Sequence, residues 1–202
     1  MKHMILILVI SFGIHQCQSS TPEIVQPAAE EKAQIDSIGG TAASLLLSNL
    51  QPALLNAISE GGLVHGITVC SDTAQQLTSM ISENLGEGIR VKRTTTQLRN
   101  PANGPDQYEK QALQYYQEHI TQSGSFPSSY AQKIIVGDST FYRFYKPMKV
   151  AGLCLNCHGN PEEFPSELVT TLNEKYPADE ATGYQAGDFR GLVSVTIQHQ
   201  LK

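Results

Sequence analysis

The chain has 202 residues, of which 40% are hydrophobic and 16% charged, and its formal net charge at pH 7 is −5. A chain of this length can bury one hydrophobic core, so we expect a single domain, and its negative charge argues against a nucleic-acid partner. No run reaches the ~20 apolar residues of a membrane-spanning helix.

The N-terminus has the features of a secretory leader. A short basic region precedes an apolar run from Met4 to Ile14, which is the length of a signal-peptide core. Cys17 and a polar run follow, as in a bacterial lipoprotein signal, although His15 and Gln16 stand where small residues are usual. We therefore expect a signal peptide over residues 1–17, export to the periplasm and a lipid anchor at Cys17. Cleavage at another position, giving an unanchored periplasmic protein, is the alternative.

Two helical patterns follow the leader. Residues 18–33 are rich in proline and acidic side chains and indicate a linker. From residue 33 to residue 59 apolar side chains recur at helical spacing, which predicts a long helix weakened at Gly39-Gly40 and Pro52 and ended by Gly61-Gly62. A second helix is predicted from apolar positions 67, 70, 74, 77 and 81. Cys70 lies on the apolar face of that helix, and on periodicity alone it is an inert packed thiol.

The remaining elements predict an α+β domain with an antiparallel sheet. Residues 89–99 form a strand candidate, and Asp106 with Glu109 gives the capping pattern of a helix that runs to about residue 120. Residues 131–136 and 140–148 predict a hairpin around Gly137, residues 166–176 a short helix, and residues 189–199 a closing strand with one buried face. Four strands joined by hairpin and meander, with helices before and between them, favour this fold class.

The segment Cys154-Leu155-Asn156-Cys157-His158 is the C-x-x-C-H pattern of covalent c-type haem attachment. The two thiols form thioethers with the haem vinyl groups, and the adjacent imidazole becomes an axial iron ligand. A zinc site would need two further ligands, and no second C-x-x-C or H-x3-5-H pattern follows. A thioredoxin-type redox pair would need a βαβ context. The motif therefore predicts one covalent haem c, and the expected export agrees with haem attachment outside the cytoplasm.

A haem gives Cys70 a second interpretation, as a ligand on the other side of the iron. Met148 is a rival, although it lies close before the motif and is better explained by packing. His65, His119 and His199 are further candidates, each more often a surface or core histidine. The cations Arg90, Lys92, Arg93 and Arg99 are typical of a solvated strand face, with one arginine as a candidate partner of a haem propionate.

Several motifs together resemble the Tll0287-like haem domain family, also called DUF3365. They are Val69-Cys70, Arg93-Thr94, the run from Leu98 to Asp106, Tyr145-Lys146-Pro147, the C-x-x-C-H-G segment and the run from Arg190 to Val195. The resemblance spans about residues 35–199, and its R-N-P-A-N-x-P-D segment is the most specific part. Gly104 stands where alanine is common in the family.

The resemblance implies a PAS-like antiparallel sheet with flanking helices, preceded by a long N-terminal helix and occupying residues 34–202. It also implies one c-type haem with His158 as the proximal ligand and Cys70 as the distal thiolate. The expected function is electron transfer or redox sensing with an unidentified partner protein. The alternative is a haem-based sensor or binding module for small ligands that signals through a separate partner. No catalytic constellation is present in the sequence, so we do not expect an enzyme.

Overall fold

The computed structural model describes residues 21–198 and residue 201. The expected leader over residues 1–17, Cys17 and His199 therefore lie outside the described residues. The elements are β1 (Glu23–Val25), α1 (Ala29–Asp72), α2 (Ala74–Asn84), β2 (Ile89–Thr94), α3 (Gln107–Ser123), β3 (Tyr130–Val136), β4 (Ser139–Lys149), α4 (Leu155–His158), α5 (Ser166–Lys175) and β5 (Phe189–Ile197). Three short 3-10 helices complete the chain: η1 (Pro101–Asn103), η2 (Gly152–Cys154) and η3 (Pro161–Glu163). The fold is α+β, as the sequence predicts.

The five strands form one antiparallel sheet in the order β1-β3-β4-β5-β2. The β3–β4 hairpin confirms the sequence prediction. The closing strand β5 is present, but residues 191–195 are all buried and contribute to cores on both sides of the sheet, so the expectation of one buried face is wrong. The expected linker over residues 18–33 needs correction, because Glu23–Val25 pair with β3 and α1 already begins at Ala29. A strand of three residues shows no periodicity, and its pairing with β3 gives it its structure.

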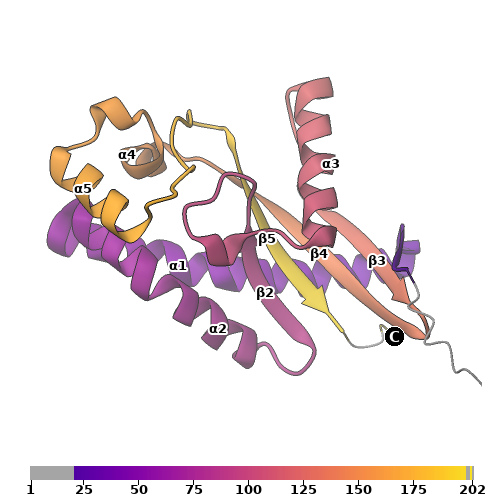
Figure 1. Ribbon diagram of the computed structural model, residues 1–202. Coiled ribbons are helices and arrows are strands. Elements are labelled where there is room, and N and C mark those ends of the chain that lie inside the picture. The colour runs from indigo at the N-terminus through magenta and orange to yellow at the C-terminus, as the bar shows by residue number, and fades with distance from the viewer. Residues whose placement is uncertain (1–20, 199–200, 202) are drawn as a thin grey trace, which may run out of the picture.

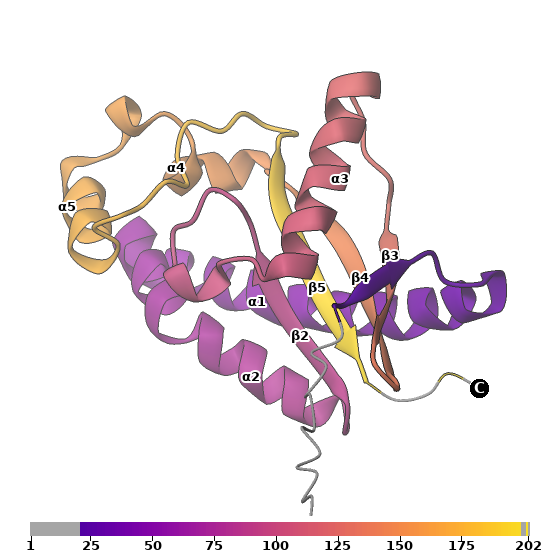
Figure 2. The same ribbon diagram turned by 45° about the vertical axis from the view of Figure 1, so that its right-hand side comes forward.

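Helices cover both faces of the sheet (Figures 1 and 2). The larger core lies between α1, α2 and one sheet face, where Ile35 and Leu46 pack with Val193 and Val195. A second core lies on the opposite face, where Leu113 and Tyr116 of α3 pack with β4 and β5 side chains. Apolar side chains therefore alternate along β4, with Phe144 in the first core and Tyr145 in the second.

Helix α1 consists of two segments that run in opposite directions. Its backbone leaves helical geometry at Gly61 and at Gly62, where φ is 71°. The chain reverses at this point (Figure 1), and Gly66 then lies so close to Ile58 that a Cβ would be 2.8 Å from it. The predicted end of the first helix at Gly61-Gly62 is thus a reversal within α1. The helix predicted over positions 67–81 is divided at Thr73, whose φ and ψ remain near helical values, so the apolar periodicity continues into α2.

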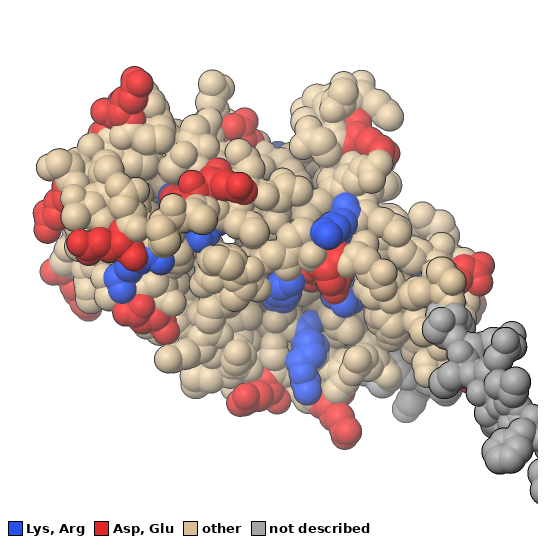
Figure 3. All heavy atoms as spheres, viewed as in Figure 1, with Lys and Arg blue, Asp and Glu red and all other residues tan. Residues whose placement is uncertain are grey.

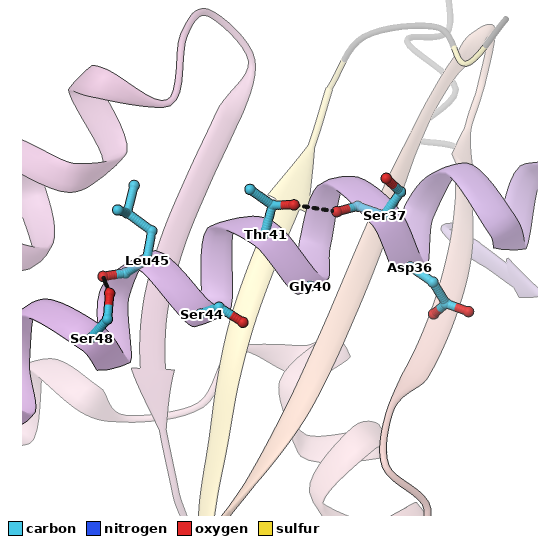
Figure 4. A pocket seen from close by; sticks show the side chains of 7 residues that line it. All are labelled: Asp36, Ser37, Gly40, Thr41, Ser44, Leu45 and Ser48. Atoms are coloured by element: carbon cyan, nitrogen blue, oxygen red, sulfur yellow. Dashed lines mark hydrogen bonds between the residues drawn. The ribbon is translucent and has the colours of Figure 1, made fainter.

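The first segment of α1 packs closely on the sheet. A Cβ on Gly39 would lie 2.2 Å from Cγ of Phe144, so glycine permits this close approach. By length and composition alone α1 is apolar enough to cross a membrane, which differs from the expectation that no run of the chain is long and apolar enough to do so. Its buried residues nevertheless pack against the sheet. A shallow hollow of about 700 Å³ lies on the outer face of the first α1 segment (Figure 4). Small residues such as Gly40 and Ser44 line it together with Leu45.

Candidate functional site

The C-x-x-C-H motif lies at one end of the molecule, where η2, α4 and α5 meet the reversal of α1 (left in Figure 1). Strand β4 ends at Lys149 and leads into the motif. The chain after α5 passes back beside the start of the motif segment. There the Val150 N–H donates to the Asp188 carbonyl at 2.9 Å, and the Gly187 N–H donates to the Val150 carbonyl at 2.8 Å. Further along, the Tyr184 N–H donates to the His158 carbonyl at 3.0 Å. The motif is therefore held between β4 and the loop that leads to β5.

The two motif cysteines are half-buried free thiols in different surroundings. Cys154 packs beside the cluster of Val150, Ala181 and Tyr184. Cys157, one helical turn further on, packs beside Ile67 of α1 and the apolar side chains of α5. Burial raises the pKa of the Cys157 thiol. The two thiols lie on one turn without a disulfide bond, which is the arrangement that double thioether attachment requires.

His158 is fixed in one tautomer by its surroundings. Its Nδ1 lies 2.6 Å from the Ala181 carbonyl oxygen, and because a carbonyl only accepts hydrogen bonds, Nδ1 carries the proton. Burial, together with the nearby Arg99 and Arg190 cations, lowers the pKa of His158 to about 3. The imidazole is thus neutral at physiological pH. Nε2 is left with its lone pair, which is the form that coordinates a metal ion.

Arg99 holds the motif to the loop after α5. Its guanidinium donates from Nη2 to the Cys157 carbonyl at 2.6 Å and to the Ala181 carbonyl at 3.3 Å, and from Nε to Asp179 at 2.9 Å. The side chain is 8% exposed. The Asp179 carboxylate also accepts from the Ala181 N–H at 2.8 Å. The expectation that Arg99 belongs to a solvated face is therefore wrong, because the protein itself supplies its partners.

Cys70 lies in the second segment of α1, which packs against α5. One turn before it, Ile67 belongs to the same apolar cluster as Leu168, Leu172 and Tyr176, against which Cys157 packs. Burial raises the pKa of the half-buried Cys70 thiol, and the Arg93 and Arg99 cations oppose this effect. The charge of a Cys70 thiolate also raises the pKa of Cys157. The chain thus brings a third thiol from a distant segment to the side of the motif.

The rival ligands lie elsewhere. Met148 packs against the larger core, which agrees with the packing explanation. The His65 side chain is 44% exposed and lies near Glu60, while His119 places Nδ1 2.8 Å from the Tyr115 carbonyl. Within the described residues, no three His, Cys, Asp or Glu side chains are grouped as ligands of one metal ion. A structural zinc site would need such a group.

The surroundings of the motif include a hollow and an acidic surface. The hollow measures about 540 Å³ and is lined by Leu63, Leu155, Phe164, Tyr184 and neighbouring residues. Its volume falls within the range of about 300–1,000 Å³ usual for ligand pockets. Acidic side chains are prominent around α5, whereas basic side chains lie near the middle of the same face, over β2 (Figure 3).

The sequence motifs did not indicate two important parts of the site, namely the Ala181 carbonyl and the Asp179 carboxylate. Both lie in a loop without periodic pattern, and a backbone carbonyl has no sequence signature. The only pointer was Arg99, which belongs to the R-N-P-A-N-x-P-D segment. Its contacts with Asp179 and Ala181 are tertiary contacts between residues 80 or more positions apart.

Comparisons with known proteins give a family and a fold. A family model described as Tll0287-like matches residues 14–198, which include β1. The crystal structure of the cyanobacterial haem protein Tll0287 is similar to this structure with a TM-score of 0.56 and 21% sequence identity. The alignment covers 87% of this chain and 99% of that chain. No match was found among curated proteins.

Proposed function

The chain belongs to the Tll0287-like family, and from this premise we propose that it is an exported c-type haem protein that acts in electron transfer or redox sensing. One observation carries the proposal. The C-x-x-C-H motif holds two thiols without a disulfide bond on one turn, next to an imidazole whose Nδ1 is hydrogen-bonded to the Ala181 carbonyl. That hydrogen bond leaves Nε2 for iron, which is the arrangement of an axial histidine.

The residues present fit one haem c. Cys154 and Cys157 would hold it through thioethers, His158 would coordinate through Nε2, and Cys70 would supply a thiolate on the opposite side. A haem supplies one-electron redox chemistry when bound, and its potential depends on axial ligands, nearby hydrogen bonds and burial. The chain contributes a neutral imidazole, held in position by the Ala181 carbonyl. Arg99 fixes the backbone of the same turn through the Cys157 carbonyl.

A thiolate opposite an imidazole donates electron density to ferric iron, so we expect a low-spin, six-coordinate haem of low reduction potential. The thiolate is expected to bind less strongly after reduction. Loss of Cys70 at that stage would open a position for a small ligand such as CO or NO. A haem-based sensor of small ligands that signals through a separate partner is therefore the alternative function. The PAS-like sheet favours it only as an analogy.

Absorption and EPR spectra of the oxidised and reduced protein, with a pyridine haemochrome assay, test the proposal. The wild-type chain should give a c-type haemochrome and low-spin thiolate signals. The Cys70→Ser variant should lose the thiolate signals but keep the covalent haem, and the Cys154→Ser, Cys157→Ser double variant should lose covalent attachment. Met148→Leu is the matched control and should leave the spectra unchanged. An unchanged ferric spectrum in Cys70→Ser would refute the thiolate ligation.

Reduction separates the two functions. Rapid, reversible reduction with both ligands retained would support electron transfer. Loss of the Cys70 ligand on reduction together with tight CO or NO binding would support sensing. Both outcomes are read from the same protein by redox titration in the presence and absence of the gas.

Export and anchoring are part of the same proposal. The apolar run before Cys17 supports a leader, and a lipid on Cys17 would tether the protein at the membrane surface. Membrane and periplasmic fractions of cells that produce the wild-type chain and the Cys17→Ser variant test this anchor. The wild-type chain should fractionate with membranes and the variant should not. Equal amounts of both chains in the soluble periplasmic fraction would show that Cys17 is no anchor.

A further inference from the structure

Strand β2 and the segment after it carry four cations, and three of them have partners. The Arg90 guanidinium donates to the carbonyl of Ile89 at 2.9 Å on the exposed surface. Lys92 pairs with the buried carboxylate of Glu109 at 2.9 Å. Arg99 pairs with Asp179. These side chains are therefore satisfied by the protein itself.

Arg93 is different. Its guanidinium forms no hydrogen bond or ion pair with another residue in the part of the chain that the structure describes, and its Nε is buried without a partner. Arg93 is partly exposed, but a guanidinium N–H that is buried without an acceptor is unfavourable, because it loses its hydration without gaining a partner. An anion supplied in the functional state of the protein would remove this cost.

The position of Arg93 in the sheet determines which anion it can reach. Side chains alternate along β2, so Arg93 shares the face of Val91, which packs in the core beneath α1 and α2. The Ser82 hydroxyl accepts from the Val91 N–H at 3.0 Å and donates to the Val91 carbonyl at 3.2 Å, which fixes α2 against β2. From this point β2 runs back beside α2 towards the end of α1, where Cys70 lies (Figure 1).

The electrostatics agree with this placement. Burial raises the pKa of Cys70, and two cations, Arg93 and Arg99, lower it. The effect of Arg93 is the larger of the two. In turn, burial lowers the pKa of Arg93, and the largest opposing effect, which raises this pKa, comes from Cys70. Tyr176 is the next group that acts on the pKa of Arg93. Arg93 therefore lies in the field of the thiol that we propose as the second haem ligand.

We infer that Arg93 is the counter-ion of the Cys70 thiolate in the haem-loaded protein. This inference rests on the proposed function, since the thiolate charge is present only if Cys70 is a ligand. The guanidinium offers several N–H donors, and a charge-assisted hydrogen bond to sulfur would neutralise the thiolate and hold it in position. Arg93 is thus a positioning residue that acts through Cys70.

The inference has a definite electrochemical consequence. A cation beside the thiolate lowers the electron density that sulfur donates to iron, and it stabilises the additional electron of the reduced state. Removal of this cation therefore shifts the midpoint potential to more negative values. The thiolate signals in the ferric EPR and absorption spectra change at the same time, because sulfur loses its charged neighbour.

The experiment compares Arg93→Gln, Arg93→Lys and Arg90→Gln in the haem-loaded full chain. Arg90→Gln is the matched control, because it removes the same charge from the same strand on the exposed surface. Spectroelectrochemistry gives the midpoint potential, and EPR and absorption spectra give the thiolate signals. Arg93→Gln should shift the midpoint negatively and alter the thiolate signals. Arg93→Lys should show a smaller change in both readouts, and Arg90→Gln should match the wild type.

Each of the following results would overturn the inference. Wild-type values in Arg93→Gln would show that the guanidinium acts on nothing at the site. A shifted midpoint with unchanged thiolate signals would show that it pairs with a haem propionate. A wild-type protein without thiolate signals would refute the ligation by Cys70 as well, which separates failure of the proposed function from failure of this inference alone. If Arg93→Gln does not fold, wild-type thiolate signals in Arg93→Lys overturn the inference, because an ammonium cannot reproduce the guanidinium geometry.

Discussion

Replacement of Arg99 by leucine should destabilise the folded chain more than any single change on the surface of β2. The variant leaves the carboxylate of Asp179, which is 11% exposed, without its cation. It also removes the donor from two carbonyl groups, those of Cys157 and Ala181. Breaking one side of a buried ion pair costs about 3–5 kcal/mol, because the remaining charge stays buried and unpaired. We expect a loss of that size in the free energy of unfolding.

Urea unfolding of the haem-loaded protein, followed by circular dichroism, measures this loss. The midpoint of unfolding should fall while the dependence on urea concentration stays constant, which identifies a change in stability. Arg90→Leu is the control and should stay within about 0.5 kcal/mol of the wild type, since Arg90 is exposed. The Arg99→Leu, Asp179→Leu double variant should recover part of the loss, because it removes the unpaired carboxylate. Equal effects of Arg99→Leu and Arg90→Leu would refute the bracing role of Arg99.

Two further predictions concern packing and pH. Gly39→Ala should destabilise the protein by about 1–3 kcal/mol, because its Cβ would lie 2.2 Å from Cγ of Phe144; the control Gly40→Ala has no atom within 4 Å and should be neutral or stabilising in thermal unfolding. The Lys133 ammonium and a backbone N–H hold the pKa of Glu31 below its ordinary value of 4.5. Because the folded-state pKa is lowered, Glu31 stabilises the protein above pH 4.5 and loses this effect as the pH falls through the folded-state pKa. The stability difference between wild type and Glu31→Gln should therefore shrink on acidification, and a constant difference from pH 7 down to pH 3 would contradict it.

The parts of the fold with local signals were predictable. Helix α3 begins with a capping box in which Asp106 accepts from the Glu109 N–H at 2.8 Å and the Glu109 carboxylate accepts from the Asp106 N–H at 3.0 Å. The helix ends at Gly124 in the left-handed conformation. Strand β5 follows from the alternating apolar and polar residues of its sequence, and it pairs with both β4 and β2, although residues 191–195 are buried on both faces. In each case neighbouring residues determine the structure, so the sequence pattern is sufficient.

The parts that depend on distant contacts were not predictable in the same way. Gly61-Gly62 indicated the end of a helix, but the reversal depends on packing of Gly66 against Ile58. Strand β1 exists through its pairing with β3. The motif cysteines were visible in the sequence, whereas the Ala181 carbonyl that orients His158 was not. Spacing along the chain predicts which residues carry the chemistry, but the geometry of their supports is decided by the tertiary structure.

The R-N-P-A-N-x-P-D segment now has a physical explanation that haem chemistry alone does not provide. Arg99 binds the carbonyl of Cys157, and the Asn100 side chain accepts from the Ala102 N–H to cap η1. Asp106 caps α3 and pairs with Arg143 of β4 at 2.7 Å. The segment therefore connects the motif to α3 and to the sheet.

This connection makes the two proposed ligand positions unequal. His158 is held at its ring by Ala181 and at its backbone by Tyr184, while Arg99 fixes the adjacent residue. Cys70 is held by the backbone of α1 and by burial, and the structure shows no hydrogen bond from a described residue to its thiol. A change in iron–ligand distance is therefore accommodated more easily on the Cys70 side. For this reason the thiolate is the ligand that we expect reduction to release, and Arg93 is the residue that we expect to oppose its release.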